Sequence, residues 1–189
     1  MKASSSTIPM SKTRAAAAKA LTSSHFELFG LPAQFALDLE RLDRGYRDIQ
    51  AKVHPDRFAH AGDAERRASM QMTTRVNEAY RVLKDPLQRA IHLLELNGVD
   101  VAFETDTAMP KEFLMRQMEM RERLEEAKSS AALASILEDL NREKKEIEQQ
   151  LTVQFDARDF QGARTLVRKL MFFDRLAEEV DEAYDTLET

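Results

Sequence analysis

Cysteine and tryptophan are absent from this 189-residue sequence, and glycine and proline occur only five times each. Without cysteine the chain has no disulfide, no thiolate metal site and no cysteine nucleophile. The scarcity of glycine and proline favours long helices over a turn-rich β architecture. No uninterrupted apolar run approaches the roughly 20 residues that a bilayer-spanning helix needs.

Charge is distributed unevenly along the chain. Residues 1–98 contain 15 basic and 11 acidic side chains, whereas residues 99–189 contain 13 basic and 22 acidic ones. Such a split suggests two modules that face different partners. Small differences of charge between domains are also common, so charge alone leaves the question open.

Residues 1–22 show no hydrophobic periodicity and include a serine-rich stretch. The absence of acidic residues before Glu27 faintly resembles an organelle transit peptide. We expect instead a disordered extension that lies outside the folded part of the chain.

Residues 23–98 are predicted to form the first folded module. A short apolar helix follows Ser23 or Ser24, either of which is a suitable N-cap residue, and ends at Gly30. The next helix begins near Asp38, with apolar residues three and four positions apart up to Val53.

The following helix spans about Ala64 to Lys84 and completes a helical hairpin. Its expected buried face consists of Ala68, Met72, Val76, Ala79, Tyr80 and Leu83. A fourth, short helix begins at Pro86, and Gly98 is its expected C′ residue.

The second module is predicted to be an antiparallel three-helix bundle over residues 111–189, after a linker over residues 99–110. Its helices are expected at about Pro110–Lys128, Ala131–Phe155 and Phe160–Leu187. The last of them carries a four-three apolar repeat that is typical of a bundle seam. This seam comprises Leu166, Leu170, Phe173, Ala177, Val180, Tyr184 and Leu187. The predicted fold class is therefore all-α.

The tripeptide His54-Pro55-Asp56 lies in the loop of the predicted hairpin. Proline stiffens the loop, and the aspartate can accept charge-assisted hydrogen bonds from a partner. The preceding helix has a basic outer face, which consists of Arg41, Arg44, Arg47 and Lys52. A solvated charged face would explain these basic residues without the loop motif. No nucleophile, metal cluster or phosphate-binding loop accompanies the tripeptide, so the pattern indicates binding and not catalysis.

Residues 24–98 resemble a J-domain, the module that activates DnaK-type chaperone ATPases. The resemblance rests on the segment 25–31, the loop tripeptide, the segment Asn77-Glu78-Ala79-Tyr80 and Asp85-Pro86. It implies that the tripeptide and the basic face contact the chaperone. Val53 stands where relatives often have tyrosine, and Arg57 where they often have lysine.

The first bundle helix has more apolar residues than one face needs. At about 100° per residue, Phe113, Met120, Leu124 and Ala127 form a core stripe. The other side carries apolar residues and acids, namely Leu114, Met115, Met118, Glu119, Glu122 and Glu126. Such a patch suggests a partner surface to which methionine can adapt, although the linker or the first module could instead cover it.

Phe172 lies off the edge of the seam that contains Phe173, because two adjacent residues cannot both lie centrally on one helical face. It is expected either to join the patch on the first bundle helix or to be buried against the second.

A J-domain followed by a three-helix bundle resembles the HscB family, co-chaperones of iron–sulfur cluster assembly. The segments Phe113–Glu122 and Val167–Asp174 carry this likeness. It implies that the bundle binds the scaffold protein IscU through Leu114, Met115, Met118, Glu119, Glu122, Glu126 and Phe172. Met171 stands where some relatives have a basic residue.

The resemblance further implies a non-enzymatic adaptor that delivers IscU to the DnaK-type chaperone HscA and stimulates its ATPase. It implies no cofactor, neither ATP nor iron, and no membrane or nucleic-acid partner. A bacterial cytoplasmic location is expected. Two other functions stay open: a general J-protein for unfolded clients, and a nucleic-acid-binding adaptor that uses the basic helix.

Overall fold

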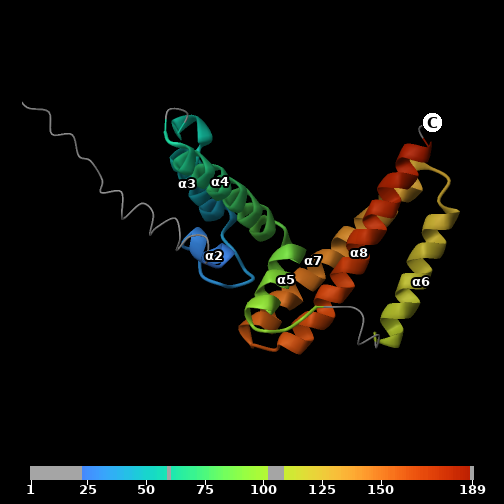
Figure 1. The fold of residues 1–189 in the computed structure, drawn as a ribbon. Helices are drawn as coiled ribbons and strands as arrows, with labels where there is room; N and C mark the ends of the chain where they lie inside the picture. The colour runs from blue at the N-terminus through green and yellow to red at the C-terminus, as the bar shows by residue number, and fades with distance from the viewer. Residues whose placement is uncertain (1–22, 59–60, 102–108, 188–189) are drawn as a thin grey trace, which may run out of the picture. The chain divides into compact units, whose positions relative to one another are not determined.

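The computed structural model describes residues 23–58, 61–101 and 109–187, and every regular element within these ranges is helical (Figure 1). This confirms the predicted all-α class. The helices, in chain order, are α2 (His25–Leu28), α3 (Leu39–Val53), the 3₁₀ helix η1 (Pro55–Phe58), α4 (Asp63–Lys84), α5 (Pro86–Leu96), α6 (Lys111–Glu126), α7 (Ser130–Asp156) and α8 (Phe160–Leu187). The predicted extension over residues 1–22 lies outside the described residues, as does most of the predicted linker.

The residue contacts divide the chain into two compact units. Within the described residues, the first comprises those up to Ala33 and from Leu37 to Asp85, and the second comprises those from Gln34 to Ala36 and from Pro86 onward. Apart from residues 34–36, the second unit therefore begins at α5, whereas Gly98 is the predicted end of the first module. The physical reason is that α5 buries Leu87, Leu93 and Leu94 and packs along α8.

The first unit is ordered at its start by local caps. Ser24 accepts a hydrogen bond from the Glu27 amide at 3.2 Å, and the Ser24 amide donates to the Glu27 carboxylate at 2.8 Å. This reciprocal capping box satisfies two free amides of α2. Gly30 then ends the turn with a φ of +62°, a conformation that glycine adopts without strain.

Helices α3 and α4 form the predicted hairpin. The Asp38 carboxylate caps α3 by accepting from the Arg41 amide at 2.9 Å. Between the two helices, the rings of Tyr46 and Tyr80 stack with centroids 4.1 Å apart, and the Tyr80 hydroxyl donates to Asp43 at 2.8 Å.

The prediction of the buried face of α4 is wrong for one residue. Ala68 is exposed, whereas the neighbouring Ser69 is buried and its hydroxyl donates to the Val53 carbonyl at 2.6 Å. Near this end of α4 the neighbouring structure is the last turn of α3, which offers carbonyl oxygens instead of an apolar face. A polar side chain is therefore the one that becomes buried there.

In the second unit, α7 and α8 form a long antiparallel pair, and α6 lies alongside them (Figure 1). The buried seam residues of α8 include Leu166, Leu170, Phe173 and Val180, as predicted. Ala177 and Tyr184 are half-buried and Leu187 is exposed, so the predicted seam becomes open towards the end of α8. The Tyr184 hydroxyl donates to the Ser130 carbonyl at 3.0 Å, and this hydrogen bond links the end of α8 to the beginning of α7.

Within the described ranges, no helix is both long and apolar enough to cross a membrane. The same part of the chain contains no group of three or more His, Cys, Asp or Glu residues that could hold a metal ion.

Candidate functional site

The loop tripeptide follows α3 directly and opens η1. His54 and Asp56 have side chains that are 53% and 91% exposed. The His54 Nδ1 atom accepts a hydrogen bond from the Asp56 amide at 3.3 Å. Because Nδ1 is the acceptor, a neutral His54 ring carries its proton on Nε2. The loop therefore presents one donor and one carboxylate to solvent within three residues.

Three side chains hold the end of α3 beneath this loop. The Arg57 guanidinium donates to the Ala51 carbonyl at 2.7 Å. The hydroxyls of Ser69 and Thr73 both donate to the Val53 carbonyl, at 2.6 and 3.2 Å. Carbonyls in the last turn of a helix lack partners within the helix, so these bonds stabilise the place where the loop begins. Sequence reasoning identified Arg57 only as a departure from a family pattern and missed the other two.

The basic residues of α3 are all exposed, and the structure gives them different surroundings. Arg41 donates to the Gly30 carbonyl at 2.9 Å, so it also holds the end of the α2 turn. Arg44 lies 3.6 Å from Glu40, one helical turn earlier. Arg47 and Lys52 are exposed on the same helix.

Behind this face, Lys84 donates a hydrogen bond to the Tyr80 hydroxyl at 2.6 Å and lies 3.7 Å from Asp43. The hydrogen bond to Tyr80, with the nearby Asp43 charge, raises the pKa of Lys84. These contacts join α4 to α3 at the end of the hairpin opposite the loop.

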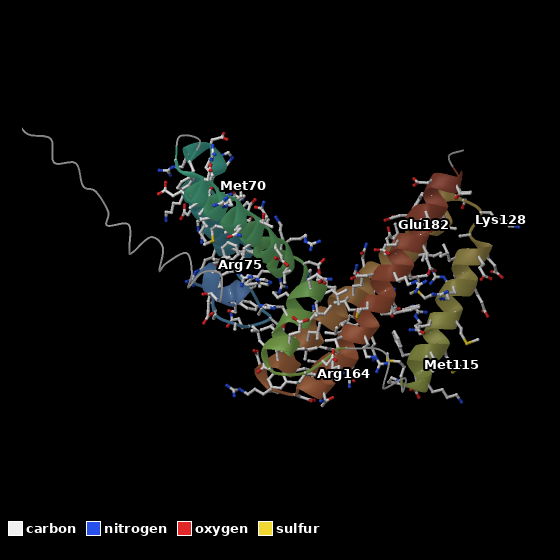
Figure 2. The ribbon with its side chains drawn as sticks, viewed as in Figure 1. Met70, Arg75, Met115, Lys128, Arg164 and Glu182 are labelled. Carbon is white, nitrogen blue, oxygen red and sulfur yellow. The ribbon has the colours of Figure 1, made fainter. Side chains whose placement is uncertain are left out.

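The second candidate surface lies on α6. Leu114, Met115 and Met118 are 44%, 61% and 63% exposed, whereas Phe113 and Met120 are buried. Figure 2 shows Met115 on the side of α6 that faces away from α7 and α8. The two faces predicted for this helix are therefore present. Most of the linker that was a possible cover for this patch, residues 102–108, lies outside the described residues.

Phe172 is half-buried and stands at the border between core and surface. Its ring packs edge-on against Phe113, with centroids 5.7 Å apart, and against Phe173 at 5.5 Å. The guanidinium of Arg121 lies over the same ring at 5.8 Å. These contacts place the Phe172 ring against Phe113 and Arg121 of α6.

The acidic residues Glu119, Glu122 and Glu126 are exposed along α6. Glu119 accepts a hydrogen bond from Arg116 at 2.9 Å, while Arg116 also pairs with Glu143 of α7 at 2.6 Å. The hydrogen bond to Glu143 raises the pKa of Arg116.

A second ion pair holds α6 against α7. Arg123 lies 2.8 Å from Asp139 of α7, which also pairs with Arg142. Hydrogen bonds from Arg123 and then Arg142 lower the pKa of Asp139. Sequence reasoning missed this network, because helical periodicity does not say which charged side chain of a neighbouring helix is within reach.

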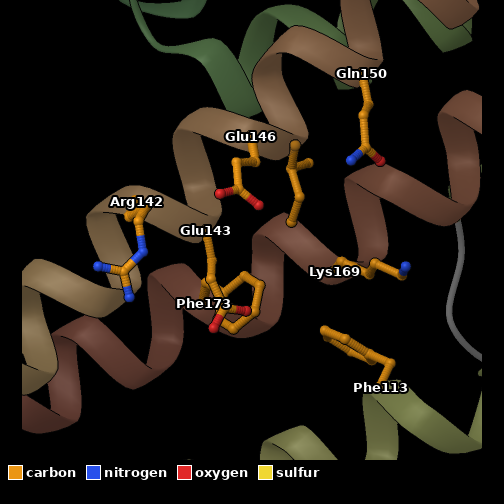
Figure 3. Close-up of a pocket in the computed structure, with 8 residues that line it drawn as sticks. Phe113, Arg142, Glu143, Glu146, Gln150, Lys169 and Phe173 are labelled. Carbon is orange, nitrogen blue, oxygen red and sulfur yellow. The ribbon is translucent and has the colours of Figure 1, made fainter.

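Beneath the start of α6 lies a cavity of about 290 Å³ between α6, α7 and α8 (Figure 3). On the α6 side it is lined by Phe113 alone. The other lining residues come from α7 and α8, namely Arg142, Glu143, Glu146, Ile147, Gln150, Lys169 and Phe173. The Lys169 ammonium lies 5.4 Å from the centre of the Phe113 ring. Near its beginning, α6 thus meets this cavity through a single aromatic side chain.

Comparison with known proteins gives one consistent result. Residues 109–181 match a family described as the HSCB C-terminal oligomerisation domain. A protein from Burkholderia vietnamiensis named co-chaperone protein HscB homolog is 52% identical over 172 residues, covering 89% of this chain and 98% of the relative. A protein of the same name from Paraburkholderia xenovorans is 50% identical over 171 residues, with the same coverage of both chains.

Solved structures agree. Human co-chaperone protein HscB superposes with a TM-score of 0.82 at 32% identity, covering 86% of this chain and 83% of the human one. Chaperone HscB from Vibrio cholerae superposes with a TM-score of 0.76 at 37% identity, covering 87% and 99%. The similarity therefore extends over both units and not over the bundle alone.

Proposed function

This chain belongs to the HscB family of co-chaperones, and from that premise we propose that it binds the iron–sulfur scaffold protein IscU, delivers it to the DnaK-type chaperone HscA and stimulates ATP hydrolysis by HscA. The observation that carries the proposal is the pairing of two exposed surfaces of opposite character in two units. One is a stiff polar loop beside a basic helix, and the other is an apolar patch bordered by acids.

The loop and the basic face of α3 are the proposed chaperone-binding surface: His54, Pro55, Asp56, Arg41, Arg44, Arg47 and Lys52. The support for this is physical. The exposed Asp56 carboxylate is available to an arginine or a backbone amide of a partner, and the exposed basic residues can steer an acidic partner towards it.

The α6 patch is the proposed scaffold-binding surface: Leu114, Met115, Met118, Glu119, Glu122, Glu126 and Phe172. Large apolar side chains at 44% to 63% exposure lose contact with water when a partner covers them, and this stabilises the complex. The half-buried Phe172 is held by two neighbouring aromatic rings, so it loses little conformational freedom on binding.

In this proposal the protein acts as an adaptor and not as an enzyme, and it requires no ATP or iron of its own. The hydrolysis belongs to HscA and the cluster belongs to IscU. A bacterial cytoplasmic location, where both partners would be met, is part of the proposal.

The test measures ATP hydrolysis by HscA at saturating concentrations of the full-length protein, with and without IscU. The wild-type protein should stimulate hydrolysis, and IscU should add to the effect. His54→Gln should abolish both the stimulation by the protein alone and the additional stimulation with IscU, because the exposed loop no longer offers its donor in the same place. Leu114→Ser should keep the stimulation by the protein alone and lose only the additional stimulation that depends on IscU.

The helical circular-dichroism spectrum of each variant serves as the folding control. Wild-type stimulation by a folded His54→Gln variant would contradict the chaperone assignment. Equal binding to many denatured proteins, unaffected by Leu114→Ser, would favour a general co-chaperone for unfolded clients.

A further inference from the structure

A second cavity, of about 460 Å³, opens between α6 and α8 and is lined in part by Phe172. From α8 it is lined by Arg168, Met171, Phe172 and Arg175, a spacing that places all four side chains on one helical stripe. Gln117 and Arg121 of α6 line the facing wall. We refer to this cavity as the arginine groove.

The arginine groove is basic, although residues 99–189 as a whole carry nine more acidic than basic side chains. Three of its lining residues are arginines, and none of its lining residues is acidic. Arg121 and Arg175 share one neighbouring carboxylate, that of Glu179, at 3.3 and 3.5 Å. One carboxylate shared by two guanidiniums leaves net positive charge at the groove.

The groove is continuous with the proposed scaffold-binding surface, because Phe172 belongs to both. On α6, at about 100° per residue from Phe113, Arg121 lies at about 80°, Leu114 at about 100° and Met118 at about 140°. Glu119, Glu122 and Glu126 follow at about 180° to 240°, whereas the exposed Glu125, about two turns beyond Met118 along the helix, lies at about 120°. Over residues 114–122 of α6, a partner that lies across the helix therefore meets a basic groove, then an apolar strip, then an acidic edge.

We propose that the arginine groove binds an acidic segment of the scaffold partner, one that carries an Asp or Glu carboxylate next to an apolar side chain. This inference rests on the proposed function. The guanidiniums of Arg121 and Arg175 bind the carboxylate, since arginine offers paired donors that match carboxylate geometry. The Met171 side chain and the Phe172 ring receive the apolar neighbour, and methionine adapts its shape to it.

The order of charges also fixes an orientation. The part of the partner that contacts the groove is acidic, and the part that contacts Glu122 and Glu126 is basic, with the apolar contact between them. A partner docked in the reverse orientation would place like charges opposite one another, which is unfavourable.

A titration of full-length protein with IscU tests the groove against the patch. The double variant Arg121→Gln, Arg175→Gln should bind about tenfold more weakly, with a smaller dependence on salt. A matched double variant, Lys128→Gln with Lys145→Gln, changes the net charge equally at exposed positions away from the groove and should bind within about twofold of wild type. Arg175→Gln alone, at a side chain that is 75% exposed, guards against a folding defect and should show part of the loss.

A photo-crosslinking residue at Gln117 provides a second measurement that does not depend on weakening the complex. Mass spectrometry should locate the crosslink in an IscU segment that contains Asp or Glu. A crosslink confined to a segment without acidic residues would overturn the groove proposal, as would arginine variants that bind like the lysine control.

The outcome for Leu114→Ser separates the two proposals. Loss of binding in Leu114→Ser, with full binding in the arginine double variant, retains the scaffold surface and rejects the groove. If wild-type protein does not bind IscU at all, the proposed function fails first.

Discussion

The loop between α3 and α4 and the outer face of α6 are both exposed, yet they are built in opposite ways. The loop begins at a helix end whose carbonyls are held by Arg57, Ser69 and Thr73. The α6 face instead carries flexible apolar side chains such as Met115 and Met118, which are 61% and 63% exposed. A fixed polar surface suits the recognition of one geometry, whereas a methionine-containing apolar surface suits a partner whose contours vary.

Among the substitutions that test this comparison, the removal of apolar anchors from α6 should have the largest effect, a loss of IscU affinity. Leu114→Ser with Met118→Ser should weaken IscU binding by roughly a thousandfold, since central anchors cost about 2 kcal/mol or more each. The unfolding free energy should change by only about 0.5 kcal/mol for each substitution, because the two residues are surface residues with exposures of 44% and 63%.

Calorimetric titration and thermal unfolding of the same protein measure both quantities. Val153→Ser is the matched control, since Val153 is an exposed apolar residue on α7 at 63%. A large loss of stability with binding retained would mean that these residues belong to the core of the folded protein.

Two adjacent phenylalanines sharpen the border between core and surface. Phe173 is 1% exposed, so Phe173→Ala should cost about 3–5 kcal/mol of unfolding free energy. Phe172→Ala should cost about 1 kcal/mol, since it loses mainly its edge contacts with two rings. Urea denaturation of the pair measures the difference, and equal losses would place Phe172 in the core.

Charge reversal on α3 tests the polar surface in turn. Arg44→Glu with Arg47→Glu should slow association with HscA about tenfold at low salt and flatten its salt dependence, because exposed charges mainly steer the encounter. IscU affinity should stay at the wild-type value. The control places the same reversals at Arg67 and Arg81, exposed residues of α4. A parallel loss of IscU affinity would show that the two surfaces do not act separately.

The smallest expected effect concerns Asp139, between α6 and α7. Arg123 and Arg142 lower its pKa in the folded state, so its contribution to stability is present above the unfolded-state pKa and is lost as the pH falls through the folded value. Asp139→Asn should therefore reduce stability by at most about 1 kcal/mol at neutral pH.

The difference between wild type and Asp139→Asn should shrink below about pH 4. Unfolding curves of both proteins across this range check the sign. A difference that grows in acid would contradict the assignment of the ion pairs.

Much of the helical architecture could be predicted from the sequence, because periodicity and caps are local. The cap at Asp38, the ends of α8 and the two faces of α6 follow from residues close in the chain. The assignment of α5 to the second unit could not be predicted, since an amphipathic stripe shows that a face is buried without showing against which helix.

The same limit applies to the candidate surfaces. The exposure of Leu114 and Met118 follows from their angle on one helix, and the sequence was sufficient for it. The arginine groove depends on residues of α6 and α8 that are about fifty positions apart and meet only through tertiary packing. Their functional roles stay predictions until the variants are measured.

The hydroxyls of Ser69 and Thr73 both donate hydrogen bonds to the Val53 carbonyl, and these bonds should affect amide hydrogen exchange at the end of α3. The next amide, that of His54, donates to the Gln50 carbonyl at 3.0 Å at the end of α3. An opening of this helix end also breaks its contacts with α4. Deuterium uptake at the His54 amide should therefore follow the separation of the two helices, which makes the loop tripeptide an indicator of local unfolding in the first unit.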